Sequence, residues 1–480
     1  MSMWYTVFSL QAAIFAICML LGLLVLHLRF GEALLACAFM CPAPLFQVAG
    51  GAGSWIFVGD VVAVAFLLKF VLSRTSKPFS MAVAQSTRGL VILAAALLAI
   101  PTFATLFGLA WNPQPRSWPF VWLQVVRSLS YFAVFHHFAS GRRLITRPDN
   151  YLLLQCLFFM LVCFCGLAQY GLGWDLDLWN LTIKANPGEG NWGYGGGFMA
   201  LYRGAVGGWA IGILAILPIV LIPRLGWSLL LPFAAAVVFV AVLATGSRQG
   251  MAIGIVVFAY GLLRGIRVAT PARRLPVIVQ FAVVMVVLFI VAGVTSGQLS
   301  GTRLDQWVTR RFAQFGELSS AGDVANLALS RGSRVGAAWD NITSSIPTFL
   351  IGVGFGVEQL FAVAGGYVIV LLDSELFQVW QLGGIIALVL YLTFLLKLGI
   401  CLRPGNWPAD QEKRIAASAG TGVIFGGILL LWGHFFLLNF HANQAPVAYW
   451  CWSLLGIAVA SCRSDANPGV QEPQQLSEVR

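Results

Sequence analysis

The chain has 480 residues, of which 59% are hydrophobic and only 10% are charged, and its mean hydropathy is +0.84. Soluble domains are typically about a quarter charged, so this composition excludes an ordinary soluble enzyme and predicts a polytopic membrane protein. In a soluble protein, the net charge of +11 would suggest nucleic-acid binding. Here the basic residues gather in short turns between apolar runs, where they set orientation, so no nucleic-acid partner is expected.

Apolar runs long enough to cross a bilayer, about 20 residues each, recur along the whole chain. They predict an all-α fold with about 12–13 transmembrane helices. Full spans are expected at 5–28, 55–73, 89–110, 118–139, 150–172, 205–223, 227–245, 249–266, 275–296, 378–400, 416–438 and 446–461.

One further apolar run, 33–49, contains Pro42 and Pro44 near its middle. Two prolines would break a simple helix, so we expect a half-helix or a short hairpin there. The N-terminus has no basic region and no small-residue cleavage site, so the first run is expected to be a retained helix. Residues 1–462 are interpreted as a single transmembrane domain, and the polar tail 463–480 as disordered and cytoplasmic.

The turns between spans predict the orientation of the chain. Their basic residues fall on one face, which the positive-inside rule makes cytoplasmic; these are Arg74, Lys77, Arg88, Arg142, Arg143, Arg147, Arg264, Arg267, Arg273, Arg274, Arg403, Lys413 and Arg414. The opposite face then carries the loops 174–203 and 297–376 and the turn at 246–248. If 33–49 is counted as a span, the large external loop 297–376 lies between the tenth and eleventh full spans.

The external loop 297–376 is rich in arginine and contains no lysine. Cationic residues on the outer face run against the orientation rule, and guanidinium groups suit phosphate, so the loop predicts a bound anion. The arginines are Arg303, Arg310, Arg311, Arg331 and Arg334.

The loop 174–203 combines glycines with Trp192, Tyr194 and two other tryptophans. Such a composition suits stacking against sugar faces, although aromatic side chains at a membrane surface also serve as interfacial anchors. Arg203 directly precedes a span, and Arg248 lies in an outer turn between Gly246 and Gly250. Each either reaches toward lipid headgroups or points at a ligand phosphate, and several arginines together could clamp a diphosphate.

Three segments stand out after residue 200 of the chain: SRGSRVGAAWDNITSSIPTFLIGVGFG (330–356), TGSRQG (245–250) and LYRGAVGGWAIG (201–212). Together they resemble the O-antigen ligase and O-antigen polymerase superfamily. The resemblance implies a large external loop that binds an undecaprenyl-diphosphate-linked glycan, arginines that hold the diphosphate, and an acceptor-sugar hydroxyl that displaces it. Arg334 matches the loop arginine of the family, Arg203 and Arg248 match more weakly, and Arg331 is a neighbour without a counterpart.

The chain departs from the ligase pattern, because Asp373-Ser374 stands where ligases place a His-Asn pair, eleven residues before Gly384. The departure favours a polymerase that joins lipid-linked repeat units by inverting, metal-independent transfer without a cofactor. Asp373, or Glu375 as its competitor, would take or orient the proton of the attacking hydroxyl. Asp373 would otherwise only cap the helix that follows.

By this resemblance the protein is a multi-pass enzyme of the bacterial cytoplasmic membrane, active on the periplasmic face. Its partners would be the lipid-linked oligosaccharide, the growing glycan, membrane lipid and a chain-length regulator protein. The alternatives are a ligase that attaches finished glycan and a transporter of lipid-linked sugar or a small anion.

A few polar residues lie within or near the apolar runs. Charges inside a membrane are functional hints, and Asp60, Lys69 and Arg127 are three of them. Asp60 resembles a family acid, for which we expect a packing or pairing role. His434 and His441 are assigned no catalysis, and the cysteines show neither disulfide nor metal-ligand spacing.

Overall fold

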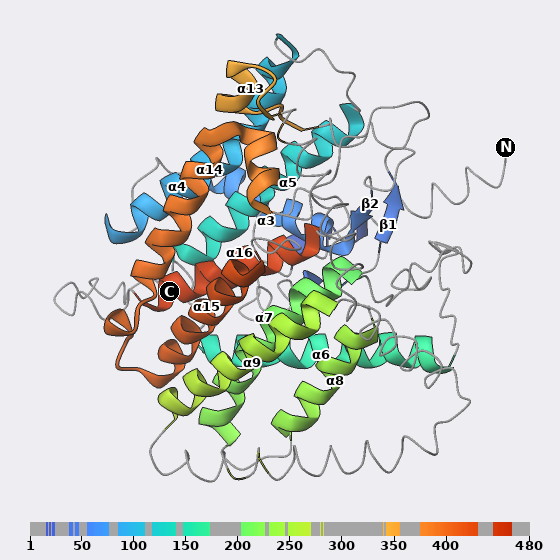
Figure 1. The fold of residues 1–480 in the computed structure, drawn as a ribbon, viewed down its shortest axis with the longest axis vertical. Coiled ribbons are helices and arrows are strands. Elements are labelled where there is room, and N and C mark those ends of the chain that lie inside the picture. Colours follow the sequence, from blue (N-terminus) through green and yellow to red (C-terminus); the bar gives the residue numbers. More distant parts are fainter. Residues whose placement is uncertain are drawn as a thin grey trace, which may run out of the picture.

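The computed structural model of the chain describes residues 38–41, 44–47, 55–75, 85–110, 118–140, 147–172, 203–225, 230–244, 248–269, 342–355, 375–430 and 445–462, with isolated positions within 16–24, at 279 and 282, and at 339. Apart from two short strands, its regular structure is helical (Figure 1). The predicted spans 5–28 and 275–296 lie largely outside these residues.

Ten described helices coincide with predicted spans. They are α3 (Val58–Thr75), α4 (Gln85–Phe107), α5 (Trp118–Ala139), α6 (Pro148–Leu172), α7 (Arg203–Leu225), α8 (Leu230–Ala244), α9 (Arg248–Val268), α14 (Glu375–Cys401), α15 (Gln411–Leu430) and α16 (Ala445–Ser461). Three shorter elements join them: η1 (Gly108–Ala110), α13 (Ile346–Ile351) and η3 (Pro404–Asn406).

Three of the described helices are long and apolar enough to cross a membrane, over Thr87–Phe107, Pro148–Cys165 and Leu376–Cys401. The outward surfaces of α4 and α14 are also apolar. Large exposed side chains on these helices include Ile92, Phe103, Leu106, Val389, Leu392, Leu396 and Ile400. Water would not favour such surfaces, whereas lipid would, so the structure supports a helical membrane protein.

The run at 33–49 contains a strand and not a helix at residues 44–47, so the all-α expectation needs one correction. Strand β1 (Pro44–Gln47) pairs antiparallel with β2 (Trp55–Phe57), with Pro44 opposite Phe57 and Gln47 opposite Trp55. Proline disfavours the helix interior and is compatible with extended backbone, so these residues suit a strand better than the half-helix that was one of the two expectations, the other being a short hairpin. The second strand leads directly into α3.

The two ends of the bundle are defined by side-chain and backbone contacts. At one end Arg224 of α7 donates to Asp149 of α6 (Nε to Oδ2, 2.8 Å). At the same end Arg147 lies 3.8 Å from Glu412 of α15. The guanidinium of Arg264, in the last turns of α9, stacks over Trp407, which follows α14 (5.3 Å). These contacts gather several of the basic turns at one end, as the charge pattern predicts; the other is called the α13 end below.

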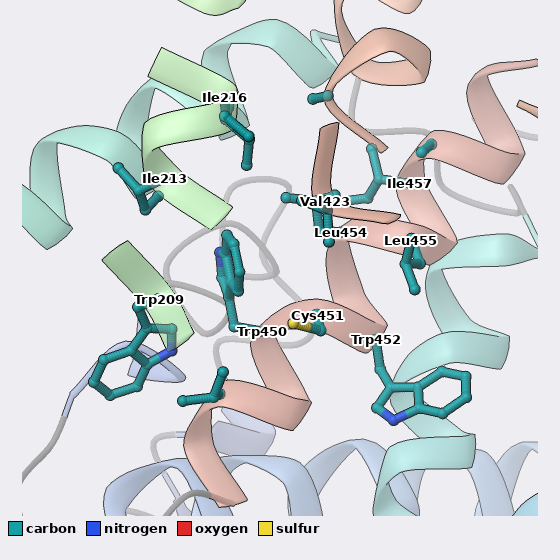
Figure 2. Close-up of a cluster of buried hydrophobic side chains, with 14 of the residues drawn as sticks. Trp209, Ile213, Ile216, Val423, Trp450, Cys451, Trp452, Leu454, Leu455 and Ile457 are labelled. Carbon is teal, nitrogen blue, oxygen red and sulfur yellow. The ribbon is translucent and has the colours of Figure 1, made fainter. Parts of the chain in front are cut away.

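Helix α16 lies in the centre of the apolar core (Figure 2). Its Trp450 points toward Trp209, Ile213 and Ile216 of α7, and all four side chains are buried. Trp452 points to the opposite side of α16, where it packs edge-on against Phe135 of α5 (5.3 Å between ring centroids). The last described helix of the chain therefore separates α7 from α5.

Helices α7 and α9 pack with their backbones in contact. A Cβ atom added at Gly261 would lie 2.4 Å from the carbonyl oxygen of Ala215, and one at Gly265 would lie 2.5 Å from that of Pro218. Only glycine permits this approach, which is the usual device by which helices in membranes pack closely. Contacting residues advance together along both helices, so α7 and α9 run parallel.

Candidate functional site

The predicted site residues fall into two groups. Arg331, Arg334, Asp373, Trp192 and Tyr194 lie outside the described residues. Arg203, Arg248 and Glu375 are the first residues of α7, α9 and α14, so the structure places their backbones.

The backbones of Arg203 and Arg248 are brought to the same level at the α13 end. Residues 215 and 261 are in contact, as are residues 218 and 265, so the offset between the two parallel helices is 46 to 47 residues. Gly426 of α15 confirms this register, because it faces Ile211 and Val257 together. Extended nine residues beyond Val257, the last contact that fixes it, the same offset sets the first residue of α9 level with residue 202, next to the first residue of α7.

Two parallel helices that begin side by side also bring the positive partial charges of their N-termini together. The N-terminus of each helix carries a positive partial charge and unsatisfied backbone N–H groups, which favour anions. An arginine at each start adds a full charge to this pair of helix ends. The sequence predicts a convergence of arginines from separate segments, and these two helix starts, 45 residues apart in the chain, stay candidates for it.

Glu375 begins a helix in another part of the bundle. Helix α14 packs mainly against α4 and α13, whereas α7 and α9 pack mainly against each other and α15. Glu375 thus belongs to one group of packed helices, and Arg203 and Arg248 belong to another. The described residues do not bring them together.

The segment after α13 enters the bundle and ends the described part of the external loop. Val353 N–H donates to Gln381 O (2.8 Å) and Gly354 N–H donates to Leu382 O (3.0 Å). Two backbone hydrogen bonds therefore hold this segment against α14. Gly384 has a φ of 67° and interrupts the helix there. The Gly-x-Gly of the motif, Gly352 and Gly354, also has positive φ values, of 83° and 73°.

Thr105 of α4 holds the same segment from the other side, and sequence reasoning missed it. Its hydroxyl donates to Pro101 O (2.6 Å) and accepts from Phe355 N–H (2.6 Å). Gly354 lies so close that a Cβ there would be 2.3 Å from Thr105 N. No sequence signal marks this threonine, because its partner is 250 residues away.

Thr105→Val should loosen the segment at 352–355, because it removes the hydroxyl and keeps the shape. Loss of a buried hydrogen bond to a backbone N–H costs about 1–2 kcal/mol. We expect a lower melting temperature in detergent and faster amide exchange at 352–355, measured by hydrogen–deuterium exchange mass spectrometry. Thr105→Ser keeps the hydroxyl and is the matched control. Equal exchange in the valine and serine variants would show that the hydroxyl does not hold the segment.

A buried ion pair between Arg127 and Asp60 is a second cluster of polar groups toward the α13 end among the described residues. The Arg127 guanidinium of α5 binds the Asp60 carboxylate of α3 through two bonds, Nε to Oδ1 (2.8 Å) and Nη2 to Oδ2 (2.7 Å). Tyr449 of α16 donates its hydroxyl to Oδ1 (3.0 Å), and Phe57 N–H donates to Oδ2 (2.9 Å). The carboxylate therefore accepts four hydrogen bonds, and the expected pairing role of Asp60 is confirmed.

This geometry makes Asp60 a structural junction. It lies three residues after Phe57, the residue before α3, and accepts its N–H as the third helical residue does in a capping box. Through Arg127 and Tyr449 it also binds α5 and α16. One carboxylate thus joins β2 and the helices α3, α5 and α16, and all four hydrogen bonds that it accepts come from groups of the protein.

Among the residues that the structure describes, no three His, Cys, Asp or Glu side chains group closely enough to hold a metal ion. No protein-family model and no curated protein matches the sequence. The resemblance described above therefore rests on the three segments that carry it.

Proposed function

We propose that the protein is a membrane glycosyltransferase that extends a bacterial surface polysaccharide from lipid-diphosphate-linked repeat units. The observation that carries the proposal is the level, side-by-side start of α7 and α9 with Arg203 and Arg248 as their first residues. Two arginines and two helix N-termini at one place suit a diphosphate. The resemblance of the surrounding segments supplies the reaction class.

In the proposed reaction, a hydroxyl oxygen of the acceptor sugar attacks the anomeric carbon of the donor sugar. The bond from that carbon to the diphosphate oxygen breaks, and undecaprenyl diphosphate leaves with the electron pair. The hydroxyl proton passes to a carboxylate, for which Asp373 and Glu375 are the candidates. Arginines, with Arg334 among them, would stabilise the negative charge that develops on the leaving diphosphate.

The start of α14 bears on whether Asp373 caps that helix or serves as the base. The helix begins at Glu375, so Ser374 is the residue immediately before it, and serine is itself a favoured cap residue. Asp373 stands one position further out and lies outside the described residues. Capping and a chemical role are therefore both compatible with the start of α14.

Deletion of the gene tests the function. Surface glycan from the deletion strain should consist of single repeat units, and the natural gene should restore long chains. Long chains left unattached to their acceptor would identify a ligase, and lipid-linked units retained in the cytoplasm would identify a transporter. Either result would contradict the polymerase proposal.

Arg203→Lys and Arg248→Lys should each lower polymer formation about 10²-fold or more, the usual effect of removing one strong stabilising donor from a reacting centre. Lysine keeps the charge but loses the planar fork that binds two phosphate oxygens. Polymer length on gels and protein amount in membranes would be measured together. Arg267→Lys, at the opposite end of α9, is the matched control and should leave polymer unchanged. Normal polymer in both test variants would exclude a diphosphate clamp at the starts of α7 and α9.

A further inference from the structure

Helix α13 carries large apolar side chains that no part of the described protein covers. Ile346 is 77% exposed and Leu350 41% exposed, and they lie one turn apart on the same face. Trp339, seven residues before Ile346, is 46% exposed although its ring packs edge-on against Trp380 (5.5 Å between ring centroids). A short helix in an aqueous loop would be expected to turn such side chains inward.

The opposite face of α13 is fixed to the bundle. Thr348 is buried, and its N–H is capped by Ser345 Oγ (3.2 Å). Trp380 of α14 donates its indole N–H to Phe349 O (3.4 Å) and packs edge-on against the Phe349 ring. The orientation of the helix is therefore set by the protein, and the apolar face points away from it for a structural reason.

The level of α13 relative to the bilayer follows from its neighbours. The apolar stretch of α14 runs from Leu376 to Cys401, and about 20 residues span the hydrocarbon core. Counted back from Cys401, that length ends near Leu382, which accepts the hydrogen bond from Gly354. On α4 the apolar stretch ends at Phe107, two residues beyond Thr105, which holds Phe355. Both helices thus place the segment after α13 at one boundary of the hydrocarbon.

The exposed face of α13 continues a surface that membrane-crossing helices already present. Helix α13 packs on α4 as well as α14, and Figure 1 shows it beyond the upper end of α14. The last turns of α4 expose Phe103, Leu106 and Phe107 at this same end. A tryptophan at this level is typical of a membrane interface.

We propose that α13 is an interfacial helix whose Ile346 and Leu350 side chains lie among the acyl chains of the bilayer leaflet at this end of the bundle. The polar residues just before it, Thr343 and Ser344, are exposed and face the headgroups and water. The external loop is then tethered to the membrane surface at its C-terminal part. This inference rests on the membrane-protein fold and is independent of the proposed reaction.

Spin labels report this placement directly. In a chain whose nine cysteines are replaced by alanine or serine, single cysteines are introduced by Ile346→Cys, Leu350→Cys, Thr343→Cys and Leu396→Cys, labelled and reconstituted in phosphatidylethanolamine–phosphatidylglycerol vesicles. Power saturation then compares accessibility to oxygen, which concentrates in lipid, with accessibility to a water-soluble nickel chelate. Thr343 is the water control, and Leu396 of α14, 65% exposed, is the lipid control.

Positions 346 and 350 should give the lipid pattern, with an oxygen-to-nickel ratio several-fold above that of position 343. Nickel accessibility at 346 equal to that at 343 would place α13 in water and overturn the proposal. Low accessibility to both reagents would mean that protein covers the face, which overturns it as well. A benzophenone amino acid at position 346 in the otherwise natural chain gives a second measurement, and its cross-link should form to phospholipid.

Discussion

Arg127→Met should severely reduce the amount of folded protein, because it leaves the Asp60 carboxylate buried without its counter-charge. Both side chains are almost fully buried, so water cannot replace the guanidinium. Removal of one partner from a buried ion pair typically costs about 3–5 kcal/mol. We expect little monodisperse protein by fluorescence-detected size exclusion, and a large drop in melting temperature for what remains.

The same substitution at an exposed ion pair is the control. Arg147 and Glu412 lie 3.8 Å apart with side chains 66% and 37% exposed, and such pairs contribute about 0–1 kcal/mol. Arg147→Met should therefore leave yield and melting temperature nearly unchanged. If Arg127→Met behaves like Arg147→Met, the buried pair does not stabilise the fold.

A compensated variant separates loss of charge pairing from loss of packing. Asp60→Asn combined with Arg127→Met removes both charges, and the asparagine oxygen can still accept from Phe57 N–H or from the Tyr449 hydroxyl. We expect this double variant to be more stable than Arg127→Met alone, because neither member of the pair is then ionised. Equal instability of the two would attribute the loss to packing around the arginine stem.

Gly384→Ala should disrupt the contact between α13 and α14. Gly384 has a φ of 67°, which costs about 1–3 kcal/mol for a residue with a side chain, and the added Cβ would lie 2.1 Å from Leu350 O. Leu350 belongs to α13, so the clash would push that helix away from α14. We expect the free energy of unfolding to fall by more than about 3 kcal/mol in all, since overpacking adds a further cost of about 1–3 kcal/mol.

Gly399→Ala is the matched control in the same helix. A Cβ at Gly399 would meet nothing within 4 Å, and alanine is favoured over glycine inside a helix by about 1 kcal/mol. Melting temperature should therefore rise slightly for Gly399→Ala and fall strongly for Gly384→Ala. Similar melting temperatures for the two variants would show that the interruption at Gly384 is not required by the fold.

The positions of the helices could be predicted from the sequence because apolar length alone determines them. The predicted span 118–139 coincides with α5, and the span 446–461 starts one residue after α16. The strand at 44–47 could not be predicted, because two prolines mark a break without saying what replaces the helix. Its partner β2 lies within a predicted span, and a three-residue strand leaves no recognisable alternation.

The candidate site was predictable in its residue types and not in its arrangement. Arg203 and Arg248 were expected on one face, but the glycine register that sets them level is a property of two packed helices. Asp60 was expected to pack or pair, and the sequence marks Arg127 and Lys69 alike as charges in or near apolar runs without showing that Arg127, 67 residues away, is the partner. Thr105 carries no pattern at all, since its role depends on the segment that packs against it.

The central position of α16 has a consequence for the order in which the chain can be completed during synthesis. Asp60 enters the membrane early and can meet Arg127 soon afterwards, but the Tyr449 hydroxyl that it also binds is made 389 residues later. Until α16 is made, α5 and α7 lack the helix that separates them, and the side chains that pack against Trp450 and Trp452 lack these partners. The bundle can therefore close only after α16 has been made, long after the pair between Asp60 and Arg127 can form.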